Sequence, residues 1–354
     1  MKNKYLYNMQ FATLTFFLIN SFFINVGYNI LTTKSMTDTI FDIIIGGTLI
    51  LLFLFLILWI RKNYKQDLIK TIMSFKILKY PLSLLLIITL GLASIYTLNS
   101  LTSFIHYYML NEVNSFIISI TIIITTFYLV KKDIPTITRI SEICFYIYII
   151  VFILGFIGLY KYIDFNNLKP FNTISINNHI NTSLHFFNYS ILPIFLLLGL
   201  KKEDYKKHDD ILIIIFTLIS IFIIFLQLIL IISVLGINLT NIYVSPDIMI
   251  YKKISFLNIL ERVEVFLSFN QLLNGIFIIT INTYLIKKIL TSFIKKEKEL
   301  TILTLLGLIF IFFNNTNITK EIYLILNLII LIITVILLIK LIIHKYILQS
   351  EDLF

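Results

Sequence analysis

The sequence has few charged residues for its length. Only 14% of its 354 residues are Asp, Glu, Lys or Arg, whereas 58% are hydrophobic. A soluble globular protein has about a quarter charged residues, because polar groups must cover its surface. This shortage excludes a water-soluble fold of this length and predicts a surface that faces lipid.

Cysteine is almost absent, and Cys144 stands alone in an apolar run. A single cysteine allows no internal disulfide and no cysteine metal site. The five histidines are dispersed, and the sequence contains no phosphate-binding glycine loop, paired-histidine metal motif or nucleophile elbow. We therefore expect no enzyme, no metal and no cofactor.

Long apolar runs dominate what is present. A membrane-spanning helix needs about 20 apolar residues, and its backbone groups must be paired internally. The sequence predicts ten such spans, at residues 9–31, 39–60, 81–110, 113–130, 138–160, 184–200, 211–236, 257–286, 300–313 and 323–343. The predicted fold is therefore an all-α integral membrane protein with a single transmembrane domain over residues 1–354.

The basic residues indicate the orientation of these spans. Of the 29 lysines and arginines, 22 fall in alternate loops on the side that carries both chain ends, and 7 fall on the other side. Cytoplasmic loops carry such an excess. We therefore expect cytoplasmic termini, and the net charge of +10 needs no nucleic-acid partner to explain it.

Ten spans divide into two halves of five, residues 1–160 and 184–343. Halves with an odd number of spans enter the membrane from opposite sides, as in the inverted repeats of many secondary transporters. In such LeuT-like folds the first helix of each half is broken near the bilayer midplane. The sequence therefore predicts breaks in spans 1 and 6, where substrate and coupling ion would bind.

Polar residues and helix breakers interrupt both spans. Pro193 removes a backbone donor from span 6, and Gly27 tolerates a non-helical backbone in span 1. The interruptions are Asn20, Ser21, Asn25 and Gly27 in span 1, and Asn188, Tyr189, Ser190 and Pro193 in span 6. The alternative is an ordinary proline kink in a sequence that is rich in asparagine throughout.

Two other spans carry a polar stripe at helical spacing. The stripes consist of Tyr96, Asn99, Ser103 and His106 in span 3, and of Glu261, Glu264, Ser268, Gln271, Gly275 and Asn282 in span 8. Polar side chains are costly in lipid, so both faces should point into the bundle. They either line a binding site or form hydrogen bonds that only hold the helices together.

Two segments resemble a known family. Residues 254–272 read ISFLNILERVEVFLSFNQL, with Glu-Arg-x-Glu at Glu261, Arg262 and Glu264, and residues 161–171 read KYIDFNNLKPF. These segments, together with the length and span number, resemble the spore-germination permease family. Its members are the B subunits of nutrient germinant receptors, within the amino acid–polyamine–organocation superfamily.

The resemblance implies a nutrient ligand, an amino acid in the usual case, bound between spans 1, 3, 6 and 8. It also implies two partners, a germinant-receptor A subunit and a lipoprotein C subunit, and a place in the cell membrane, the spore inner membrane. The candidate ligand-binding residues are Asn20, Ser21, Asn25, Gly27, Asn99, Ser103, Asn188, Tyr189, Ser190, Glu264, Ser268 and Gln271.

Two functions fit this architecture. The first is the nutrient-sensing subunit of a germinant receptor. The second is a stand-alone, ion-coupled secondary amino-acid transporter, which needs a group that couples the ion. The acidic residues expected near the membrane are Glu142, Glu261 and Glu264. This small number favours sensing over pumping, or else a sodium site built from carbonyl and hydroxyl groups.

Overall fold

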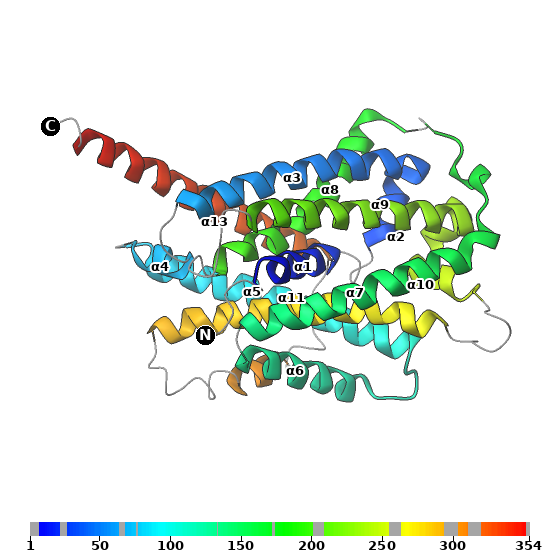
Figure 1. Ribbon diagram of the computed structural model, residues 1–354, viewed down its shortest axis with the longest axis horizontal. Coiled ribbons are helices and arrows are strands. Elements are labelled where there is room, and N and C mark those ends of the chain that lie inside the picture. Colours follow the sequence, from blue (N-terminus) through cyan, green and yellow to red (C-terminus); the bar gives the residue numbers. More distant parts are fainter. Residues whose placement is uncertain are drawn as a thin grey trace.

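The computed structural model is a bundle of long helices (Figure 1). It describes residues 7–21, 27–63, 68–75, 77–132, 134–171, 174–200, 209–254, 263–293, 304–310 and 320–351. No strand occurs among these residues. The short helix α1 lies in the middle of the bundle, and the longer helices run beside it along the long axis.

The helices follow the apolar runs of the sequence. They are α1 (Tyr7–Asn20), α2 (Gly27–Ser35), α3 (Thr39–Asn63), α4 (Leu68–Met73), α5 (Lys79–Tyr108), α6 (Ser115–Lys131), α7 (Ile134–Leu159), α8 (Ile176–Phe195), α9 (Asp209–Ile242), α10 (Pro246–Tyr251), α11 (Val263–Phe293) and α13 (Lys320–Glu351). Residues 304–310 are also helical. The four short 3₁₀ helices are η3 (Met36–Asp38), η4 (Tyr160–Tyr162), η5 (Phe165–Leu168) and η6 (Leu196–Gly199).

Seven helical stretches of the described chain are long and apolar enough to cross a membrane. Two more apolar helices, Met9–Asn20 and Ser115–Lys131, are shorter. The predicted ninth span, 300–313, is described only over residues 304–310. The all-helical membrane architecture is therefore confirmed, whereas the count of ten spans stays a prediction.

The predicted first span corresponds to two helices. Helix α1 ends at Asn20, and α2 begins at Gly27. Asn25 lies outside the described residues. Helix α1 packs mainly on α9 and α7, whereas α2 packs on α9 and α8. The end of α1 therefore lies inside the bundle, where its last carbonyl groups need partners from other helices.

The predicted break at Asn188–Ser190 is wrong. Helix α8 is continuous through these residues and through Pro193, and it changes to 3₁₀ geometry only at Leu196. Beside the proline, the Leu192 backbone N–H donates to Asn327 Oδ1 of α13 at 3.1 Å. The partner helix thus satisfies the backbone where proline disturbs it, and α8 does not need to unwind.

A helix break falls instead in α9, at Gly236. This residue has φ 73° and ψ 163°, which interrupts an otherwise continuous helix. The carbonyl groups that the break frees are paired: Ser233 O accepts from the Asp164 N–H and from Asn167 Nδ2, at 3.1 and 2.9 Å. Val234 O accepts from Lys253 Nζ at 3.0 Å. The segments that follow α7 and α10 therefore hold the bend in place.

We expect Gly236→Ala to lower the thermal unfolding midpoint of the purified chain. A Cβ at Gly236 would have room, since its nearest neighbour is Asn167 at 3.7 Å, so the cost is one of backbone conformation. That cost is about 1–3 kcal/mol for a non-glycine residue.

Gly91→Ala is the matched control. Nothing lies within 4 Å of a Cβ at Gly91, which is in the middle of α5. Alanine is the better helix former by about 1 kcal/mol, so this variant should equal or exceed the native chain in stability. Equal unfolding midpoints for Gly236→Ala and the native chain would contradict the positive φ at Gly236.

Candidate functional site

A buried polar cluster surrounds the end of α1. Asn20 Nδ2 donates to Phe16 O at 3.0 Å and to Ser220 Oγ of α9 at 2.8 Å. Asn274 Nδ2 of α11 donates to Asn20 O at 3.3 Å. Asn20, Ser220 and Asn274 are almost fully buried. Side-chain amides thus supply the donors that the last carbonyl groups of α1 lack within their own helix.

A small cavity, here called the Asp247 pocket, continues from this cluster toward α10. Its volume is about 20 Å³, which is enough for one water-sized group. Gln271 Nε2 donates to Asp247 Oδ2 across the pocket. The lining residues are Tyr148, Phe152, Gln227, Asp247, Ile248, Tyr251, Ser268, Asn270, Gln271 and Asn274.

Helix α10 places Asp247 in the pocket. The segment Ser245–Pro246–Asp247 puts a proline at the first helical turn, where its missing N–H costs nothing, and an acid beside it. The six-residue helix packs on α9 and α11. The packing leaves Asp247 only 4% exposed.

The Asp247 pocket gives its acidic side chain an unusual pKa. Burial raises the pKa of Asp247 to about 7, although the backbone N–H groups of Asp247 and Ile248 and the Gln271 amide act in the opposite direction. Burial, with Tyr148 and Asp247 nearby, also raises the pKa of the Tyr251 phenol. The carboxyl group of Asp247 therefore gains and loses a proton near neutral pH.

Four of the predicted site residues lie in or beside the pocket. Ser268 and Gln271 line it, and Asn20 is joined to it through Asn274. Ser21 is buried at the end of α1, where its hydroxyl donates to Leu18 O at 2.6 Å.

Two more of the predicted residues lie at the starts of α2 and α11. Gly27 is the buried first residue of α2. Glu264 is in the first turn of α11, but its side chain lies outside the described residues.

The remaining predicted residues do not line the Asp247 pocket. Tyr189 stacks on Tyr323 at 5.6 Å between ring centroids, and Tyr323 stacks on Tyr96 at 4.7 Å. This stack joins α8, α13 and α5 away from α10. The other four residues are placed as follows: Asn99 and Asn188 are half-buried, Ser103 is exposed, and Ser190 donates within α8 to Phe186 O.

The sequence analysis missed Asp247, Tyr148, Asn270 and Asn274. One signal was available for Asp247, because Ser-Pro-Asp is typical of a helix start. That signal predicts a short helix in the loop 237–256. It does not predict that the helix folds inward, because burial of α10 depends on α9 and α11.

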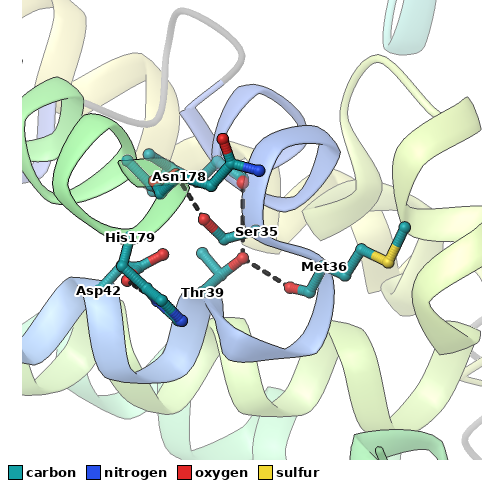
Figure 2. A network of polar contacts seen from close by, with 8 residues as sticks. Ser35, Met36, Thr39, Asp42, Asn178 and His179 are labelled. Atoms are coloured by element: carbon teal, nitrogen blue, oxygen red, sulfur yellow. Dashed lines mark hydrogen bonds and ion pairs between the residues drawn. The ribbon is translucent and has the colours of Figure 1, made fainter. Parts of the chain in front are cut away.

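A second polar network joins the α2–α3 corner to the start of α8 (Figure 2). His179 Nδ1 lies 2.7 Å from Asp42 Oδ1, and the Asp42 side chain is 1% exposed. Ser35 Oγ and Thr182 Oγ1 are 2.5 Å apart. Within the described chain no three His, Cys, Asp or Glu residues are placed to hold a metal ion. These contacts join α2 and α3 to α8.

Comparison with known proteins gives one informative result. The family model described as spore germination protein, a permease family, matches residues 11–322. The match covers α2 to α11 completely, and α1 and α13 in part. Comparison with curated proteins gives no match.

Proposed function

The chain belongs to the spore germination permease family, and on that premise we propose that it is the nutrient-sensing membrane subunit of a germinant receptor. It is a multi-pass membrane protein. Membership of a permease family implies a receptor or transporter rather than an enzyme. The observation that carries the proposal is the buried polar pocket between α10 and α11, which Asn274 joins to the end of α1.

The size of the pocket favours sensing. A volume of about 20 Å³ admits a single small group and not a whole amino acid. A nutrient therefore binds only if the helices around the pocket move apart. Such a ligand prefers the open arrangement, and unequal binding to two arrangements is what shifts a receptor between them.

We further propose the five-plus-five inverted repeat, with halves 1–160 and 184–343. Exchange of the halves would pair α1 with α8, α3 with α9, α5 with α11 and α7 with α13. The helix contacts support this exchange, because α1 packs on α9 as α8 packs on α3. Likewise α1 packs on α7 as α8 packs on α13, and α5 contacts α13 as α11 contacts α7. In such folds ligands bind at the repeat interface.

The proposal includes the cellular setting. The chain would lie in the spore inner membrane with both termini in the cytoplasm. It would act with a germinant-receptor A subunit and a lipoprotein C subunit, to which the movement of the bundle is passed on.

The second candidate is a stand-alone, ion-coupled amino-acid transporter. Asp247 favours it, because coupled transport needs a buried group that gains and loses a cation. A pull-down of the tagged full chain in mild detergent, with mass spectrometry of the co-purified proteins, separates the two. Recovery of a second polytopic subunit and a lipoprotein supports the receptor. Recovery of the chain alone, with nutrient uptake in proteoliposomes, supports the transporter.

We expect Asn274→Leu to lower the sensitivity of the nutrient response by about 5- to 150-fold. The substitution removes the amide that joins Asn20 to the pocket and leaves an unpaired carbonyl behind, at about 1–3 kcal/mol. The measurement is the nutrient dose that gives half-maximal germination in cells complemented with each variant.

Asn282→Leu is the matched control. Asn282 lies two turns further along α11, is fully buried, and has no side-chain hydrogen bond within the described chain. We expect this variant to accumulate and respond as the native chain does. A normal nutrient response from the Asn274→Leu variant would mean that the ligand does not bind in the Asp247 pocket.

A further inference from the structure

Three amide oxygens in the Asp247 pocket and beside it, at the end of α1, lack a hydrogen-bond donor in the described part of the chain. The side-chain oxygens of Asn20, Asn270 and Asn274 are buried, and none accepts a hydrogen bond from the described part of the chain. Two of these amides have a fixed orientation, since Nδ2 of Asn20 and Nδ2 of Asn274 already donate elsewhere. A ligand with N–H donors would supply what these oxygens lack.

The carboxylate of Asp247 also has no cationic partner among the described residues. The two nearest lysines in the sequence are engaged elsewhere: Lys253 Nζ donates to Val234 O, and Lys252 lies over the Tyr108 ring. A buried ionised carboxylate is costly unless a cation pairs with it. The missing positive charge is therefore one that a ligand can bring.

Aromatic rings complete the surroundings of Asp247. Tyr148 and Tyr251 line the pocket, and Tyr28 of α2 lies within electrostatic range of the carboxylate. All three are buried. Tyrosine rings attract cations through their π faces, and more strongly where water is excluded.

We propose that the Asp247 pocket binds a protonated primary amine, the –NH₃⁺ group of the nutrient. The positive charge of the ammonium group pairs with the Asp247 carboxylate, and its three N–H donors face the acceptor oxygens of Asn270 and Asn274. The group is about the size of one water molecule, which matches the cavity of about 20 Å³. This assignment rests on the proposed function, because it names the part of the nutrient that the site recognises.

The test uses the full chain in lipid nanodiscs, in an amine-free phosphate buffer at pH 8 and constant ionic strength. Thermal unfolding is followed with added ethylammonium, tetramethylammonium or sodium, each as its chloride. We expect ethylammonium to raise the unfolding midpoint by about 2–4 °C at ten times its Kd. Tetramethylammonium has no N–H donor and should give no shift, and neither should sodium.

Two variants assign the effect to Asp247. Asp247→Asn should abolish the shift with ethylammonium, whereas Asp247→Glu keeps the charge and should retain part of it. Asp42→Asn is the matched control, because Asp42 is an equally buried acid outside the pocket. It should keep the full shift.

An equal shift of the unfolding midpoint with sodium would overturn the proposal and assign the site to an inorganic cation. A full shift with ethylammonium in Asp247→Asn would also overturn it, and so would no shift with ethylammonium in the native chain. The pull-down is a separate experiment. Receptor partners without an amine shift would reject only the amine, and an amine shift without partners would reject only the receptor assembly.

Discussion

Gly46→Leu is expected to prevent the chain from accumulating in a folded form. Gly46 lies where α3 packs on α8, one of the most extensive helix contacts in the bundle. A Cβ there would come within 2.8 Å of Phe186 Cδ1 and of the Ser183 backbone oxygen. The backbone oxygen cannot rotate away, so α3 and α8 would have to separate. We expect a loss of about 3 kcal/mol or more in stability.

The measurement is the yield of monodisperse protein in size-exclusion chromatography after extraction in mild detergent. Gly91→Leu is the control, because a side chain at Gly91 meets open space. It should give a native yield. A native yield from Gly46→Leu would mean that α3 and α8 do not approach each other as described.

The second large effect is on the pH dependence of stability. Burial raises the pKa of Asp247 to about 7 from the ordinary 3.8. Between about pH 4 and about pH 7, the folded chain therefore holds a proton that the unfolded chain has lost. The contribution of this carboxyl group to the free energy of unfolding is fully present below about pH 4 and is lost as the pH rises toward 7. A difference of this size corresponds to about 4 kcal/mol.

The titratable groups that face Asp247 do not change this sign. In the part of the chain that the structure describes, those on the packed elements are Tyr28 of α2, Tyr148 of α7 and Tyr251 of α10. Phenols stay neutral in this window. The polar residues with which α9 and α11 line the pocket are amides and a serine.

Thermal unfolding of the native chain and of Asp247→Asn at a series of pH values checks the prediction. The native midpoint should fall from pH 4 to pH 7 without added amine, and Asp247→Asn should remove most of that slope. An unchanged slope in Asp247→Asn would assign the pH dependence to other groups.

The membrane-spanning helices could be predicted because a helix that crosses lipid must consist mainly of apolar residues. Residues 39–60 and 81–110 were predicted as spans, and the helices there are Thr39–Asn63 and Lys79–Tyr108. Apolar runs of this length have no other stable arrangement in a bilayer. The end of α1 at Asn20 followed from the polar residues that interrupt the first span.

The local breaks were less predictable, because partners decide them. Pro193 lacks a backbone N–H and therefore predicts a helix break. Asn327 of another helix nevertheless stabilises α8 at this point. Gly236 is one glycine in an apolar run, and its bend depends on Asn167 and Lys253 from loops distant in sequence. Asp247 was missed for the same reason, since a loop residue becomes buried only through the helices that cover it.

The small volume of the Asp247 pocket has a kinetic consequence. Under the proposed function, a nutrient larger than one water molecule would enter only after α10 and its neighbours have opened, so opening would precede binding. The observed on-rate should then rise with nutrient concentration only up to a plateau, which equals the rate of opening. At saturating ligand, individual copies of the chain would still bind it after unequal waiting times, because each opening is a random event.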